Sequence, residues 1–296
     1  MKKYVLIIVA LIVLYYFTIP VEVKDKVINK DNQIVIVAFN NNEFTMSIDE
    51  YVLGVLACEM PALFNEEALK AEAVAIRTFY MYNKLKHEDY VAKNSDQCYV
   101  DEDKMRENWN VKYDEYLSKL RNIVNETKNE YITYEGDIIA SFYFSLSNGY
   151  TENASDVFSI DLPYLVSTSS QWDENVKTFE SNMQIEMPTF LSKLGLFDNN
   201  YVEVNNIVKT KSNRVKSLTI NQKCFTVIEI RKLLNLRSTD FEISVHDDIV
   251  NINTKGYGHG VGMSQYGANE MAKMGYKYDE ILSYYYKDTK ITKIDV

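Results

Sequence analysis

The sequence from Val55 to Tyr80 constrains the fold more than any other part of the chain. An apolar run ends at Glu59, and Pro61 follows, which stops regular structure. A segment rich in Ala, Leu, Lys and Glu begins at Glu66, and this composition favours a helix. Glu59 thus has apolar neighbours, and desolvation raises the pKa of such a carboxyl group. We predict that Glu59 is a general acid, with a salt-bridged carboxylate at a helix end as the alternative.

The predicted helix has a suitable N-cap in Asn65. Its apolar residues recur at helical spacing and form a face that packs in the core. This face comprises Ala68, Ala71, Ala75, Phe79 and Tyr82. Arg77 lies on another face and is the only arginine of the helix. We predict that Arg77 binds substrate, and a structural ion pair with Glu59 or a surface charge is the alternative.

Glycines are concentrated between Gly256 and Gly267. Such density lets the backbone approach a ligand closely and adopt positive φ. A helix is predicted from about Ser264 to Met274, and its free N–H groups suit an anion. We predict that His259, Ser264 and Gln265 line a cleft, while tight packing is the alternative for the glycines. His259 is not predicted to act as a catalytic base.

Composition excludes some classes of partner. The formal net charge is −10 and no long basic run is present, which argues against nucleic acid. Three cysteines (Cys58, Cys98 and Cys224) are too few for a disulfide framework, and we expect mainly small apolar residues there. The stretch 96–103 combines a thiol with carboxylates, but a zinc site of this kind would be atypical. We therefore predict neither a metal nor a cofactor.

The N-terminal segment from Tyr4 to Val21 contains no charged residue. Its 18 residues approach the minimum length of a membrane-spanning helix, and Lys2 and Lys3 precede it. By the positive-inside rule we expect a single-pass membrane protein with a cytoplasmic N-terminus. A cleaved signal peptide is the alternative, although Tyr15 to Pro20 lacks the small residues of a cleavage site.

The rest of the chain combines helical and strand patterns without an internal repeat. Short strands are predicted at 33–38 and 43–48, with Ser47 or Asp49 capping a helix that follows. Further helical and strand patterns alternate to the end of the chain. We predict an α+β fold: an anchor at 1–22, a stalk at 23–32 and a composite catalytic unit at 33–296, with two lobes facing a cleft as one form of it.

Three separated motifs in the expected order carry a resemblance. They are the segments 59–80, Ser141 to Glu174 and 256–291. Over roughly residues 45 to 292 the chain resembles the stage II sporulation protein D family. This resemblance implies a membrane-anchored lytic transglycosylase that cuts peptidoglycan glycan strands during engulfment of the forespore. It matches Glu59 to the catalytic acid and implies that Ser147, Asn148 and Glu152 line the cleft.

The resemblance also implies a mechanism and partners. One carboxyl group protonates the leaving oxygen and then removes the proton of the sugar's 6-hydroxyl, which leaves a 1,6-anhydro-N-acetylmuramic acid end. A peptidoglycan amidase and a membrane scaffold of the engulfment machinery are the expected partners. A non-catalytic domain that enhances an amidase and a hydrolytic muramidase are the two alternatives.

Overall fold

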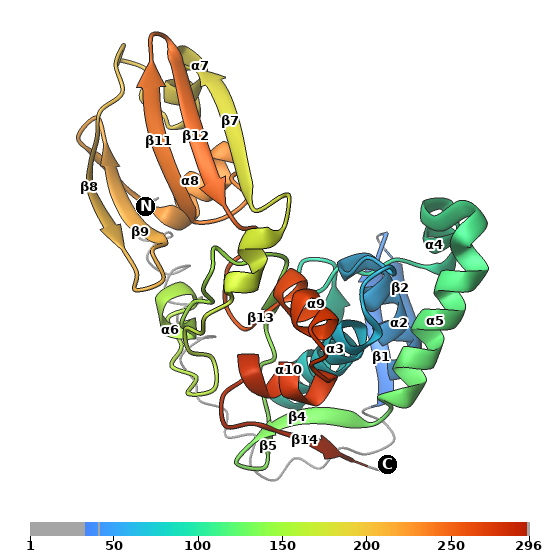
Figure 1. Ribbon diagram of the computed structural model, residues 1–296. Coiled ribbons are helices and arrows are strands. Elements are labelled where there is room, and N and C mark those ends of the chain that lie inside the picture. Colours follow the sequence, from blue (N-terminus) through green and yellow to red (C-terminus); the bar gives the residue numbers. More distant parts are fainter. Residues whose placement is uncertain (1–32, 41, 295–296) are drawn as a thin grey trace.

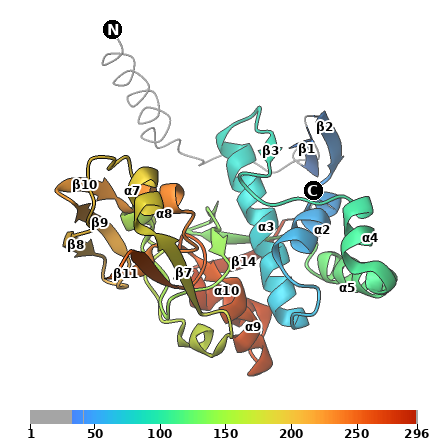
Figure 2. The same ribbon diagram turned by 90° about the horizontal axis from the view of Figure 1, so that it is seen from above.

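The computed structural model describes residues 33–40 and 42–294, and these form a mixed α+β fold with several small sheets (Figure 1). Two hydrophobic cores divide this part of the chain into two lobes. The first lobe combines residues 34–175 with residues 256–293, and the second lobe comprises residues 180–255. Figure 2, the view from above, shows the strands and helices of the second lobe beside those of the first.

The first lobe is built around one long helix, α3 (Glu66–Lys86), which packs against helices and a strand from both ends of the chain. Its elements are β1 (Ile34–Phe39), β2 (Asn42–Ser47), α2 (Ile48–Glu59), α3, β3 (Ala92–Lys93), α4 (Glu102–Trp109), η2 (Asn110–Lys112), α5 (Tyr113–Glu126), β4 (Glu130–Tyr134), β5 (Asp137–Ile138), β6 (Tyr143–Phe144), α6 (Ala154–Val157), η3 (Gln171–Asn175), β13 (Met263–Ser264), α9 (Gln265–Lys273), α10 (Tyr278–Tyr285) and β14 (Lys290–Lys293).

The two helices that frame the site begin at the residues expected from their capping signals. Ser47 caps α2 in a capping box with Glu50, and the Asn65 side chain accepts a hydrogen bond from the Glu67 N–H at the start of α3. The predicted strands before α2 pair antiparallel as β1 and β2. Helix α2 ends where Met60 becomes extended ahead of Pro61, and this places Glu59 at the helix end.

The second lobe contains two three-stranded sheets and two short helices. Its elements are β7 (Glu180–Glu186), α7 (Met187–Lys193), β8 (Val204–Lys209), β9 (Val215–Ile220), β10 (Lys223–Thr226), α8 (Val227–Leu234), β11 (Asp240–His246) and β12 (Ile249–Lys255). The strand orders are β11-β12-β7 and β10-β9-β8, with antiparallel neighbours. The chain enters the lobe through β7 and leaves it through β12, so two adjacent strands connect it to the first lobe.

The prediction of a single-pass membrane protein is contradicted by the helices of the described residues. Within residues 33–40 and 42–294 no helix is long and apolar enough to span a bilayer. Helix α3 has 21 residues, but Glu66, Lys70 and Arg77 are among its several charges. The predicted span from Tyr4 to Val21 and the stalk lie outside the described residues.

One glycine of the glycine-rich segment, Gly262, packs directly against the backbone of Phe142. Gly262 has a φ of +82°, and a Cβ there would lie 1.9 Å from the Phe142 carbonyl oxygen. Gly275 has a similar φ of +97° with nothing within 4 Å of such a Cβ. We expect Gly275→Ala to cost about 1–2 kcal/mol for its backbone conformation.

Gly262→Ala adds overpacking of about 1–3 kcal/mol or more to the same backbone cost. Its Tm by circular dichroism should therefore fall well below that of Gly275→Ala. Equal Tm values for the two variants would contradict the close contact between Gly262 and Phe142.

Candidate active site

Glu59 lies partly buried at the end of α2, and both of its oxygens accept hydrogen bonds. Its Oε1 accepts the backbone N–H of Cys98 at 2.7 Å, and its Oε2 lies 3.5 Å from Gln265 Nε2. Burial raises the pKa of Glu59 above its usual value of 4.5, while both hydrogen bonds act in the opposite direction. Glu59 therefore combines solvent access with an increased tendency to hold a proton.

A disulfide holds the loop that supplies one of these donors. Cys58 and Cys98 are bonded, with their Cα atoms 5.7 Å apart and a sequence separation of 40. Our interpretation of these two cysteines as small apolar residues was wrong, because a single bridge between distant residues leaves no spacing pattern. The bridge joins the residue before Glu59 to the residue whose N–H binds Glu59. Cys224 is free and exposed.

A second carboxyl group, Glu72 of α3, lies on the other side of Gln265. Gln265 Nε2 donates to Glu72 Oε1 at 2.8 Å, so one side-chain amide contacts both Glu59 and Glu72. Glu72 is fully buried, and its Oε2 has no hydrogen-bond partner within the described part of the chain. Burial, with a further contribution from the charge of Glu59, raises the pKa of Glu72 well above 4.5. Glu72 is therefore the carboxyl group of the pair that holds its proton more strongly.

Sequence analysis did not single out Glu72, although a signal was present. Glu72 is four residues after Ala68 and three before Ala75, so it lies on the face of α3 that was predicted to be core. A carboxyl group on such a face must be neutral or paired when buried. That placement identifies Glu72 as a residue with a special environment.

The buried Tyr51 and the partly buried Tyr143 belong to a hydrogen-bonded network next to the two carboxyl groups. The Tyr51 hydroxyl donates to Gln97 Oε1 at 3.0 Å, and Gln97 Nε2 donates to the Tyr143 hydroxyl at 2.8 Å. Burial raises the pKa of Tyr143 well above 10, and the charges of Glu59 and Glu72 disfavour its phenolate further. Tyr143 therefore stays neutral beside the site.

Arg77 is not brought to Glu59. Its fully buried guanidinium donates to the carbonyl oxygens of Thr127 (2.8 Å) and Val124 (3.3 Å), and it pairs with Asp49 at 3.4 Å. These carbonyls belong to the C-terminal end of α5 and the residue that follows it, where a cation binds favourably. The contacts favour a structural role for Arg77 rather than the predicted role in substrate binding.

Of the three further residues that were predicted to line the cleft, Asn148 and Glu152 lie where the lobes meet. The Asn148 side chain donates to Ser212 O at 2.8 Å and to Asp240 Oδ2 at 2.7 Å. Glu152 accepts hydrogen bonds from the hydroxyls of Thr210 (2.6 Å) and Ser212. Ser147 is buried and bonds to Asp173 and Ser170 of the first lobe. Asn148 and Glu152 thus connect the two lobes.

The glycine-rich segment places its three predicted residues differently. Of His259, Ser264 and Gln265, only Gln265 contacts Glu59. Ser264 caps α9 by accepting the Gly267 N–H, and its hydroxyl donates to Asp173 at 3.1 Å. His259 packs against the rings of Phe142, Phe144 and Phe158, and burial lowers its pKa to about 4. His259 is therefore neutral at neutral pH.

Metal ligands do not gather in the described part of the chain. No group of three or more His, Cys, Asp and Glu side chains there is arranged to hold an ion.

Similarity to known proteins agrees with the motifs. The profile described as "Stage II sporulation protein" matches residues 41–134. Stage II sporulation protein D of Bacillus subtilis (strain 168) is 37% identical over 265 residues, which cover 86% of this chain and 77% of that protein. Its counterpart from Bacillus amyloliquefaciens is 36% identical over the same shares. The amidase enhancer of Bacillus subtilis (strain 168) is 27% identical over 81% of this chain and 40% of its own length.

The family model and these similar sequences together define a sporulation protein. The chain belongs to the stage II sporulation protein D family.

The raised pKa of Glu72 predicts a pH dependence of stability. The folded state binds the Glu72 proton more strongly than the unfolded state, whose carboxyl has the usual pKa of 4.5. The stability that this proton contributes is present below pH 4.5 and is lost as pH rises towards the folded-state pKa. Glutamine stays neutral, so Glu72→Gln should unfold with a flatter dependence on pH in urea titrations between pH 4.5 and 8.

The exposed Glu66 of the same helix is the matched control, and Glu66→Gln should keep the wild-type slope. An unchanged slope in Glu72→Gln would show that Glu72 is ionised in the folded protein.

Proposed function

We propose that this protein is a lytic transglycosylase that cleaves peptidoglycan glycan strands to 1,6-anhydro-N-acetylmuramic acid ends during forespore engulfment. The observation that carries the proposal is the environment of Glu59. This carboxyl group is desolvated enough to raise its pKa, yet it remains partly exposed and is held by Cys98 and Gln265. A general acid for glycosidic cleavage needs these properties.

In the proposed reaction Glu59 serves twice. Its protonated carboxyl group donates to the glycosidic oxygen as the bond from C1 to that oxygen breaks. The resulting carboxylate then accepts the proton of the 6-hydroxyl, whose oxygen bonds to C1 and closes the anhydro ring. Glu59 is protonated again at the end, and no water is consumed.

The surroundings of Glu59 favour this one-carboxylate chemistry over hydrolysis. Inverting glycosidases use a second carboxylate to activate a water molecule, and retaining enzymes use it as a nucleophile. Glu72 is the second carboxyl group near Glu59, but it is fully buried behind Gln265, and burial raises its pKa so that it holds its proton more strongly than an exposed glutamate does. It is therefore suited to orienting Gln265 rather than to attacking substrate or activating water.

The likeness to an amidase enhancer favours one alternative function. In that case the protein binds glycan strands without cutting them and increases the activity of a peptidoglycan amidase. Such an amidase is also the partner that we propose for the cleaving enzyme.

Replacement of Glu59 tests the proposed acid. Glu59→Gln keeps the shape of the side chain but has no proton to donate, and loss of general acid–base catalysis typically costs about 10²–10⁴-fold in rate. We expect this loss in the release of soluble glycan fragments, with Tm close to that of the wild type. The matched control is Glu66→Gln, which should retain full activity because Glu66 is exposed on α3. Near-wild-type cleavage by Glu59→Gln would exclude Glu59 as the acid.

Mass spectrometry of the same digests identifies the reaction. Anhydro ends support the transglycosylase, and reducing ends would identify a hydrolytic muramidase. Intact strands together with a stimulated amidase would identify the non-catalytic enhancer.

A further inference from the structure

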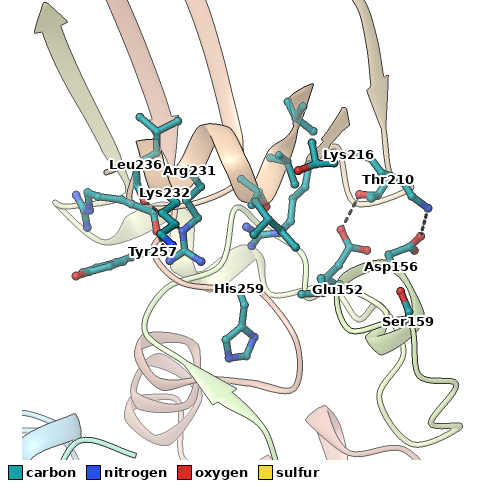
Figure 3. A pocket seen from close by; sticks show the side chains of 18 of the residues that line it. Glu152, Asp156, Ser159, Thr210, Lys216, Arg231, Lys232, Leu236, Tyr257 and His259 are labelled. Atoms are coloured by element: carbon teal, nitrogen blue, oxygen red, sulfur yellow. Dashed lines mark hydrogen bonds and ion pairs between the residues drawn. The ribbon is translucent and has the colours of Figure 1, made fainter. Parts of the chain in front are cut away.

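A pocket of about 710 Å³ lies where the two lobes meet, and Glu59 is not among the residues that line it. Figure 3 shows Glu152, Asp156 and Ser159 of the first lobe facing Thr210 and Lys216 of the second. Helix α8 and the residues after it supply another wall. The pocket is therefore formed by both lobes.

Arg214 is a buried cation in this pocket, and its side chain has no hydrogen-bond partner among the residues that the structure describes. It lies in the β8–β9 connection, where its carbonyl accepts the Thr210 N–H at 2.8 Å. Its side chain is 1% exposed, yet none of its three guanidinium nitrogens has a hydrogen-bond partner among the described residues. Burial lowers its pKa to about 10, so it is still charged at neutral pH. A buried guanidinium with unused donors is costly unless a ligand supplies the acceptors.

The neighbouring carboxylates do not use these donors. Glu152 and Asp240 favour the charge of Arg214 through space, but no carboxylate lies within 4.0 Å of it in the described chain. Glu152 accepts hydrogen bonds from Thr210 and Ser212, and Asp240 accepts one from Asn148. They partly offset the buried charge, while the forked N–H groups have no acceptor among the described residues.

Other cations make the pocket positive. Its lining includes Arg214, Lys216, Arg231, Lys232 and Arg237, against two carboxylates, Glu152 and Asp156. Lys216 pairs with Asp156 at 3.3 Å, whereas Arg231 donates to the carbonyls of Leu236 and Arg237. Lys232 is exposed. The excess of positive charge attracts an anion.

The shape and the remaining walls limit the kind of anion. Gly260 packs on Arg214, since a Cβ at Gly260 would lie 2.7 Å from Arg214 Nε. Apolar side chains, including Val157, Val227 and Leu236, also line the pocket. A planar guanidinium matches a carboxylate through two parallel hydrogen bonds, and the apolar walls suit a short aliphatic group attached to it.

We propose that this pocket binds a carboxylate carried by a small aliphatic group, with Arg214 as its bidentate partner. The proposal rests on the proposed function for the source of the ligand. Peptidoglycan offers this chemistry in the lactyl group of N-acetylmuramic acid and in the alanine end of a stem peptide.

The test is isothermal titration calorimetry of the purified protein with three probes at low salt. N-acetylmuramic acid and D-alanyl-D-alanine carry the carboxylate, and N-acetylglucosamine is the neutral sugar control. We expect at least one acid to bind more than tenfold more tightly than N-acetylglucosamine. The acid that binds identifies the lactyl group, the peptide end, or both as the ligand.

Variants assign that binding to the pocket. Arg214→Gln should weaken the binding of the acid about tenfold or more, because the bidentate contact is lost. Lys232→Glu changes only an exposed side chain at the pocket. This variant should weaken the binding of the acid about threefold to tenfold at low salt. Lys193→Glu makes the same charge change on α7, away from the pocket lining, and should leave affinity unchanged.

Two results would overturn the proposal: acids that bind no better than N-acetylglucosamine, or equal affinity in all variants. If Arg214→Gln does not fold, Lys232→Glu still decides between these outcomes. Binding is measured without cleavage, so a protein that binds the acid but cuts no glycan refutes only the transglycosylase. A protein that cuts glycan but binds the acid independently of these residues refutes only the pocket.

Discussion

The side-chain amide of Gln265 lies between the partly buried Glu59 and the fully buried Glu72, and the site depends on this contact. Glu59 ends α2, Glu72 is in the middle of α3, and Gln265 begins α9 some 206 residues after Glu59. Three helices must therefore pack correctly before the Gln265 amide can donate hydrogen bonds to both carboxyl groups. Because desolvation disfavours both charges, a proton on Glu72 lets the pair be buried without two adjacent negative charges.

The Cys98 loop completes this arrangement from the other side. Its N–H binds Glu59, and its disulfide is attached to the residue next to Glu59. Glu59 is thus positioned by a helix end, a crosslinked loop and an amide from the C-terminal segment. Such positioning restricts the conformational freedom of the Glu59 side chain, which suits the proposed catalysis by a single carboxyl group.

Much of the local structure could be predicted from the sequence, because it depends on neighbouring residues. Ser47 and Asn65 cap their helices, and the two short strands expected at 33–38 and 43–48 occur as the antiparallel pair β1 and β2. The contacts between residues far apart in the sequence could not be predicted in the same way. The Cys58–Cys98 bridge and the interactions of Arg77 with the end of α5 depend on tertiary packing, which has no periodic signal. The role of Glu72 could be predicted in part, since the sequence places it on an apolar face of its helix.

The central claim is that the surroundings of Glu59 raise its pKa, so that it holds its proton more strongly than an exposed glutamate does. The most direct measurement is a pH titration of the glutamate side-chain carbons by ¹³C NMR, with the spectrum of Glu59→Gln assigning the Glu59 signal. A Glu59 pKa clearly above the usual value of 4.5 is the predicted result. A pKa at or below 4.5 would contradict the claim, because Glu59 would then be ionised at neutral pH and would lack the proton for a general acid.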